Sequence, residues 1–415
     1  MRNGVNQLIW LAKRMLKDVE RSTVFLLLCQ ALVTRKRSPY SCHMRIGIDA
    51  RMMTPGATRG IGRYIEELVR SMVTVAPNNK YVLVTRRAIH PFSSHPSVET
   101  VVADIPWYGV REQLSMPRIL RSLKADVVHV PHWNVPVFYR GPLVITIHDL
   151  LLRHEPASAR ISTRSPFVAT LKRYGFRTTL ACALWKAKKI LVPTQFVSND
   201  LAAFYPRVSQ KVVVTGEGMG RRRLAATPSV VPPPKSKYLL YVGSAYPHKG
   251  LDLLVDAWEE LSLRHPDLHL KIAGAEDVFM RRLKDEVRRR NLHHVEFLGY
   301  VNDEELSHLY QDATAFVFPS RFEGFGLPPL EAIQHGCPVV SSDAAALPEV
   351  LGERGAFFFQ SGSGTGILRA IETVLQDPLA ARRNALNAIP ELRKRHDWVQ
   401  AAQRTLEAYS SITDT

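Results

Sequence analysis

Residues 315–331 read AFVFPSRFEGFGLPPLE, and this stretch decides the fold. Its first four residues are an apolar run that is typical of a β-strand. Residues 327–335 are predicted to form a helix, because prolines occupy the first turn and a glycine and a proline follow the last. Gly324 and Gly326 lie in the loop between strand and helix, where the backbone must turn sharply and can approach a ligand closely.

Two carboxylates accompany this loop. Glu323 lies on the loop itself, and Glu331 lies one or two turns into the helix. A spacing of eight is not a helical repeat, so only the fold of the loop can bring both to one cavity. The helix N-terminus offers unpaired N–H groups and partial positive charge, which suit an anion or a polyhydroxylated ligand. The alternative is a tight loop before an ordinary amphipathic helix that carries two solvated glutamates.

The segment from Glu323 to Glu331, with Gly-Phe-Gly-Leu-Pro between the acids, resembles the E-x7-E motif of retaining glycosyltransferases of family 4. The resemblance covers about residues 44–410 and implies the GT-B fold, an α/β architecture with two Rossmann-like parallel-sheet domains facing a central cleft. It further implies that Glu331 holds the ribose hydroxyls of a nucleotide sugar and Glu323 the sugar hydroxyls, with residues 324–326 lending backbone donors.

Apolar runs alternate with helical stretches through most of the chain, which indicates parallel sheets covered on both faces. The basic, proline-rich residues 220–237 interrupt this alternation and suit a linker between two domains. The predicted organisation is a basic N-terminal extension (1–43), an N-terminal acceptor-side Rossmann-like domain (44–219), the linker (220–237), a nucleotide-sugar-binding Rossmann-like domain (238–392) and a C-terminal helix that crosses back to the first domain (393–415).

The first predicted domain carries a histidine where a strand ends. Ligands in open α/β sheets bind at the carboxyl ends of strands, and His148 follows the run Leu-Val-Ile-Thr-Ile. The resemblance implies that His148 contacts the transferred sugar. His132 and Trp133 follow the preceding strand and are predicted, with Asp149, to line the acceptor side.

A glycine-rich loop follows the first strand of this domain. It lacks the strict G-x-G-x-x-G pattern. The resemblance places Gly60 and Gly62 against the donor, whereas the alternative is that both glycines serve only helix–strand packing.

The second predicted domain begins with a strand, a loop and a helix, and Lys249 stands directly before the helix. A diphosphate there would meet a cation, free N–H groups and the helix dipole together. Many family members carry an arginine where this chain has Ser244, so Arg321 is a candidate for the second phosphate cation. The predicted catalytic residues are His148, Glu323 and Lys249, and the predicted donor-binding residues are Gly60, Gly62, Ser244, Lys249, Arg321, Gly324, Phe325, Gly326, Leu327 and Glu331.

The composition of the 415 residues is that of an ordinary soluble protein with 46% hydrophobic residues, and the formal charge of +17 favours anionic partners. The four cysteines show neither metal-ligand spacing nor pairing, so a reduced cytoplasmic setting is expected. The basic residues lack the aromatic interleaving of a nucleic-acid platform, so no nucleic-acid partner is expected. Residues 1–43 are either a basic amphipathic segment on an anionic membrane, a tail without structural role, or sequence upstream of a start at Met44.

The resemblance therefore implies a retaining glycosyltransferase for surface polysaccharide synthesis. The Pro-His-Lys loop and residues 129–133 resemble polysaccharide mannosyltransferases that use GDP-mannose, with a UDP-hexose as the alternative donor. The expected acceptor is a saccharide or lipid-linked saccharide at the inner membrane surface, and no cofactor or metal is expected. A nucleotide-sugar epimerase of GT-B fold and a binding protein without turnover remain alternatives.

Overall fold

The computed structural model describes residues 43–53, 60–154, 166–220 and 237–413. The predicted N-terminal extension and nearly all of the predicted linker therefore lie outside the described residues. Within the described part of the chain, no helix is long and apolar enough to cross a bilayer.

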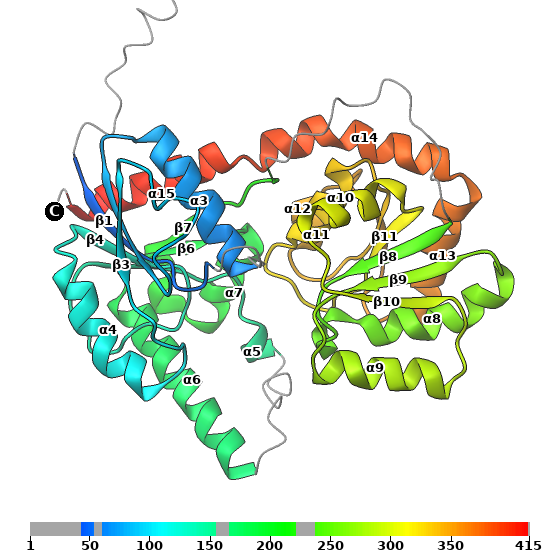
Figure 1. Cartoon of the computed structure of the whole chain (residues 1–415), viewed down its shortest axis with the longest axis horizontal. Coiled ribbons are helices and arrows are strands. Elements are labelled where there is room, and N and C mark those ends of the chain that lie inside the picture. Colours follow the sequence, from blue (N-terminus) through cyan, green and yellow to red (C-terminus); the bar gives the residue numbers. More distant parts are fainter. Residues whose placement is uncertain (1–42, 54–59, 155–165, 221–236, 414–415) are drawn as a thin grey trace, which may run out of the picture. The chain divides into compact units, whose positions relative to one another are not determined.

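The first sheet has seven parallel strands in the order β3-β2-β1-β4-β5-β6-β7 (Figure 1). Strand order reverses between β1 and β4, the kind of position where α/β sheets bind ligands. The strands are β1 (Arg45–Asp49), β2 (Lys80–Thr85), β3 (Val98–Val102), β4 (Val127–Val130), β5 (Leu143–Thr146), β6 (Lys189–Val192) and β7 (Val212–Val214), and the helices are α3 (Ile61–Val75), α4 (Val110–Ser122), α5 (Leu151–His154), α6 (Pro166–Lys186) and α7 (Gln195–Phe204).

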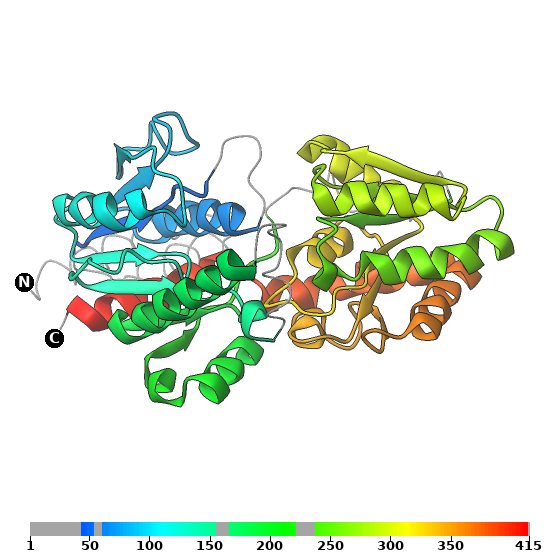
Figure 2. The same cartoon turned by 90° about the horizontal axis from the view of Figure 1, so that it is seen from below.

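The second sheet has six parallel strands in the order β10-β9-β8-β11-β12-β13, with its reversal between β8 and β11. Figures 1 and 2 show helices on both faces of each sheet, as the fully buried central strands require. The strands are β8 (Tyr238–Val242), β9 (His269–Ala273), β10 (Val295–Gly299), β11 (Ala315–Phe318), β12 (Val339–Ser342) and β13 (Phe357–Phe359), and the helices are α8 (Leu251–Arg264), α9 (Val278–Arg289), α10 (Asp303–Asp312), α11 (Leu327–Gln334), α12 (Leu347–Leu351), α13 (Gly364–Gln376) and α14 (Pro378–Arg395). The predicted two-sheet GT-B architecture is confirmed.

The loop before α11 has the form that its glycines predict. Gly326 caps the helix with φ of 95°, a backbone conformation that side chains disfavour. A Cβ atom at Gly326 would lie 2.8 Å from Cδ2 of Leu347, so both the conformation and the packing require glycine. The helix consequently starts at Leu327, directly beyond the carboxyl end of β11.

The last helix, α15 (Trp398–Thr413), belongs to the first sheet's side of the molecule. It packs beside α3 (Figure 1). Tyr409 and Nδ1 of His129 on β4 form a hydrogen bond of 2.7 Å, and Nε2 of His129 lies 2.8 Å from the Thr146 hydroxyl on β5. One buried histidine thus links the C-terminal helix to two central strands.

Three buried histidines make the free energy of unfolding depend on pH. Burial, together with nearby His148, lowers the pKa of His129 to about 3 and of His132 to about 3, while burial lowers the pKa of His396 to about 4. The unfolded chain binds these protons at about pH 6.5, so below that pH it binds more protons than the native state and stability falls as pH falls.

We therefore expect chemical denaturation to show a loss of about 2 kcal/mol for each buried histidine between pH 6.5 and pH 5. The variant His129→Gln can retain both hydrogen bonds without titrating, so its free energy of unfolding should fall less steeply over the same interval. An equal fall in variant and parent would show that His129 is not one of the responsible groups.

Candidate active site

A cavity of about 540 Å3 is lined by loops and first helix turns that follow strands of both sheets. It is large enough for a ligand of nucleotide size. Its lining brings together most of the predicted residues, namely Gly60, His148, Asp149, Ser244, Lys249, Glu323, Gly324, Phe325, Gly326, Leu327 and Glu331.

Lys249 and Glu323 face each other in this cavity. Lys249 Nζ lies 2.7 Å from Oε1 of Glu323, and the Ser320 hydroxyl donates to the same oxygen at 2.6 Å. Gly250 enables the approach, because a Cβ atom there would lie 2.0 Å from the carbonyl oxygen of Pro319. The loop before α8 therefore packs closely against the residues that follow β11, and Lys249 lies just before the first turn of α8.

Arg63 is a cavity residue that the sequence analysis missed. It lies in the first turn of α3 and pairs with Glu331 of α11 at 2.6 Å. Burial acts to lower the pKa of Arg63, but the charges of Glu331 and Asp303 outweigh burial and raise it. The guanidinium therefore stays charged inside the cavity. The sequence could have indicated this role, because Arg63 directly follows the glycine-rich loop that was predicted to lie against the donor.

His148 stands at the carboxyl end of β5, as predicted, and is held from several sides. Its Nδ1 lies 3.3 Å from Oε1 of Glu217, its Nε2 lies 3.2 Å from the carbonyl oxygen of Pro131, and the Tyr64 ring meets it edge-on at 4.7 Å between centroids. Glu217, only 4% exposed, and Tyr64 also line the cavity and were not predicted. These contacts fix the orientation of the imidazole.

Asp149, which was predicted for the acceptor side, caps α5. Its Oδ1 accepts a hydrogen bond from the Leu151 N–H at 2.9 Å, and burial raises the pKa of its carboxyl group. The Asp149 side chain therefore both lines the cavity and caps the N-terminus of α5.

Four predicted residues do not line this cavity. Gly62 is buried within α3, and His132 and Trp133 lie outside the lining. Arg321 donates to Oδ2 of Asp252 and to the carbonyl oxygen of Pro247, both at 2.6 Å. Arg321 therefore does not supply the cation that an arginine in place of Ser244 would bring to the cavity. Arg63 does line the cavity.

Among the described residues that line the cavity, acids outnumber bases. The basic ones other than histidine are Lys249 and Arg63. A diphosphate bound in the cavity could contact these two cations and backbone N–H groups at the helix starts. The acidic lining residues are Asp149, Glu217, Asp277, Asp303, Glu323 and Glu331.

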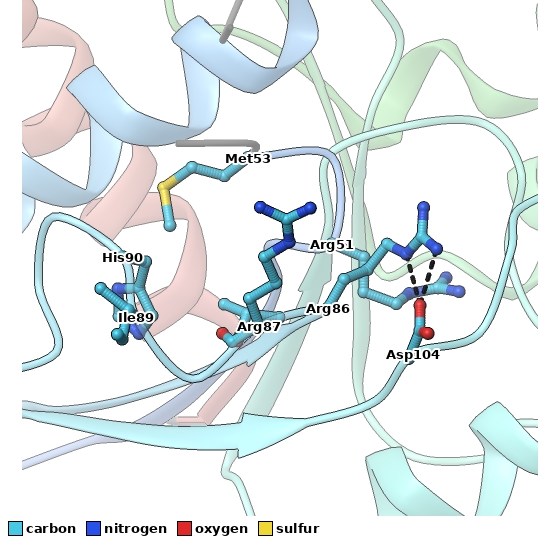
Figure 3. Close-up of a pocket in the computed structure, with 8 residues that line it drawn as sticks. Arg51, Met53, Arg86, Arg87, Ile89, His90 and Asp104 are labelled. Atoms are coloured by element: carbon cyan, nitrogen blue, oxygen red, sulfur yellow. Dashed lines mark hydrogen bonds and ion pairs between the residues drawn. The ribbon is translucent and has the colours of Figure 1, made fainter. Parts of the chain in front are cut away.

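A second, smaller cavity of about 210 Å3 lies at the carboxyl ends of β1, β2 and β3 (Figure 3). Arg86 and Asp104 form an ion pair of 2.6 Å at its side, and Arg51 lies behind them, only 1% exposed. Arg87 also borders this cavity.

Two parallel sheets whose strand ends share one cavity are the arrangement of the GT-B fold. The family model described as "Glycosyltransferase Family 4" matches residues 58–219, and "Glycosyl transferases group 1" matches residues 225–404. The chain belongs to family 4 of the GT-B glycosyltransferases.

Individual relatives agree with this assignment. The chain is 26% identical to O-antigen chain mannosyltransferase B of Escherichia coli, over 85% of this chain and 96% of that protein. It is 28% identical to a glycogen synthase of Mycobacterium tuberculosis, over 70% of this chain and 69% of the relative. Among solved structures, the fold is similar to that of sucrose-phosphate synthase from Thermosynechococcus elongatus, with a TM-score of 0.72, 19% identity, and coverage of 90% of this chain and 100% of that one.

Proposed function

We propose that this glycosyltransferase transfers mannose from GDP-mannose, with retention of anomeric configuration, to a saccharide or lipid-linked saccharide acceptor during surface polysaccharide synthesis. The observation that carries the proposal is the meeting of Lys249, Glu323, Glu331 and His148 around one cavity. The likeness to an O-antigen mannosyltransferase over nearly its whole length supports mannose as the sugar.

Each side chain has a role that its position suits. Lys249 and Arg63 neutralise the diphosphate, and the start of α8 adds backbone N–H groups. Glu331 holds the ribose hydroxyls in exchange for its present contact with Arg63. Glu323 and His148 bind hydroxyls of the transferred sugar from opposite sides of the cavity.

Catalysis then rests on charge stabilisation. As the bond from the sugar to the diphosphate breaks, negative charge grows on the leaving oxygen, and a fixed ammonium group stabilises that charge more than it stabilises the ground state. Because Lys249 can do this without a divalent cation, we include in the proposal that transfer needs no metal. The close approach of Gly324 to His148 excludes water from the sugar, which limits donor hydrolysis.

The acceptor side of the proposal follows from charge. The net charge of +17 favours an anionic partner, so we include lipid-linked saccharides at an anionic membrane surface among the acceptors. The likeness to a glycogen synthase favours a second candidate donor, a UDP-hexose.

A donor panel tests the proposal. The full chain is incubated, with and without EDTA, with GDP-mannose, UDP-glucose, UDP-galactose or ADP-glucose and a mannobiose acceptor, and products are identified by mass spectrometry. We expect transfer from GDP-mannose that EDTA leaves unchanged, and NMR of the product should show the configuration of the donor. Transfer from a UDP-sugar alone would replace mannose by another hexose, and epimerised donor in the absence of acceptor would make the protein an epimerase.

A further inference from the structure

We propose that Tyr108 and Trp133 form a platform that binds a sugar ring of the acceptor, an inference that rests on the proposed function. Tyr108 lies on the loop between β3 and α4, and Trp133 follows β4.

The backbone of Tyr108 is strained. Its φ is 63°, in the left-handed region that bulky side chains avoid, yet its side chain is 60% exposed. An exposed tyrosine gains little packing energy that could offset this strain. Such outliers persist where the surroundings enforce them, and they concentrate at ligand sites.

A fully buried carboxylate enforces this conformation. Glu112, in the first turn of α4, accepts from the Tyr108 N–H at 2.8 Å and from Nδ2 of Asn134 at 2.7 Å, and it pairs with Arg51 at 2.6 Å. Arg51 is also held by Asp49 at 2.7 Å. Burying charges is costly unless every one is paired, and this network satisfies that condition while fixing the Tyr108 and Asn134 loops relative to each other.

Two arginines fix the start of the same loop. Arg51 donates to the carbonyl oxygen of Ile105 at 3.0 Å, and Arg86 pairs with Asp104 at 2.6 Å (Figure 3). The Arg86 guanidinium also lies over the Trp107 ring, 5.5 Å from its centroid. The loop is therefore pinned on both sides of Trp107, which fixes the backbone from which the Tyr108 ring projects.

The rings form a continuous aromatic surface. Tyr108 lies 5.6 Å from Trp133 between centroids with planes tilted by 35°, and Trp133 rests edge-on against Phe176 at 4.7 Å. The negative face of an aromatic ring attracts the weakly positive C–H groups on the flat side of a pyranose. A surface of this kind selects a sugar ring by shape and leaves its hydroxyls free to bind polar groups.

His132 supplies a polar group beside this surface. The Asn134 N–H donates to its Nδ1 at 3.0 Å, so the neutral ring carries its proton on Nε2, which points to the Tyr108 hydroxyl at 3.4 Å. Burial lowers the pKa of His132 to about 3, so the ring is neutral near pH 7. Its Nε2–H can donate to a sugar hydroxyl that displaces the long contact to Tyr108.

The platform is linked to a cavity residue through the chain that follows β4. His132 directly follows Pro131, whose carbonyl oxygen contacts Nε2 of His148. The proposal is that an acceptor whose reactive hydroxyl lies near His148 places a further ring over Tyr108. A rigid, strained tyrosine suits recognition of one ring orientation, whereas insertion into a membrane needs no fixed orientation.

The test measures binding of saccharides to the full chain by saturation-transfer NMR, with mannobiose, maltose and chitobiose as probes. The variant Tyr108→Gly removes the ring and accepts the left-handed backbone, and Tyr108→Phe keeps the ring as a matched control. We expect Tyr108→Gly to raise the Kd of the bound disaccharide about tenfold with a Tm no lower than that of the parent, and Tyr108→Phe to stay near the parent. GDP should bind all three proteins equally in a thermal-shift assay.

The remaining outcomes separate the possible failures. Unchanged disaccharide binding by Tyr108→Gly, or no disaccharide binding by a parent that binds GDP, overturns the platform alone. A parent that binds neither nucleotides nor saccharides removes the proposed function as well. Reduced flotation of Tyr108→Gly with phosphatidylglycerol liposomes at unchanged saccharide binding would assign the tyrosine to a membrane surface instead.

Discussion

Replacing Lys249 by alanine is expected to lower kcat for sugar transfer by about 10² to 10³-fold, the usual effect of losing one electrostatic contact to a transition state. The ammonium group faces the cavity from the loop before α8, where the proposed mechanism has negative charge develop as the diphosphate leaves. Glu323 keeps the hydrogen bond from Ser320 when Lys249 is removed, so the fold should lose little stability. Initial rates at saturating donor, with Tm measured on the same samples, check the expectation.

Two further variants make this result specific. Lys284 also forms an ion pair, with Glu276 at 2.5 Å, but lies outside the cavity, so Lys284→Ala should keep the parent's kcat. Lys249→Arg keeps the charge with altered geometry and should recover part of the loss. A Lys249→Ala enzyme with kcat within about threefold of the parent would remove Lys249 from the catalytic role.

The fold could be predicted because the pattern of apolar and polar residues within each short segment indicates whether that segment is a strand or a helix. Continuous apolar runs separated by amphipathic stretches are typical of parallel strands covered on both faces, and the runs that begin at Leu143 and Ala315 form β5 and β11. The carboxyl ends of parallel strands share one edge of their sheet, so the sequence could place His148 at that edge of the first sheet and the loop at Glu323 at that edge of the second. That the two edges face one cavity was implied only by the resemblance to family 4.

The residues that were missed depend on pairing between distant parts of the chain. Glu217 is 69 residues from His148, and Glu112 is 61 residues from Arg51. Nothing in the local pattern at Glu112 distinguishes a fully buried acid from the solvated glutamate expected in the first turn of a helix. The interpretation of Arg321 shows the same limit, because Arg321 lies on the loop before α11 and its partner Asp252 lies on α8, 69 residues away in the sequence.

Replacing Gly324 by alanine is expected to lower kcat/KM by about 10²-fold. The added methyl group would displace the loop, and even a small displacement would separate the groups that are proposed to position the sugar. A Cβ atom at Gly324 would lie 1.7 Å from the carbonyl oxygen of His148 and 2.8 Å from its carbonyl carbon, and neither backbone atom can rotate away. The Thr194 hydroxyl donates to the Gly324 carbonyl oxygen at 3.0 Å, so the loop is held from that side as well. The added methyl group must therefore push Glu323 and His148 apart.

The control is Gly175→Ala, since a Cβ atom at Gly175 meets nothing within 4 Å and alanine favours the helix that contains it. We expect this variant to keep the parent's kcat/KM and Tm. In Gly324→Ala, far-UV circular dichroism should remain that of the parent while kcat/KM and donor affinity fall together, because both sheets are intact and only their shared cavity is disturbed. Full activity in Gly324→Ala would mean that the contact between Gly324 and His148 is not needed during turnover, and the water-excluding role given to it would be wrong.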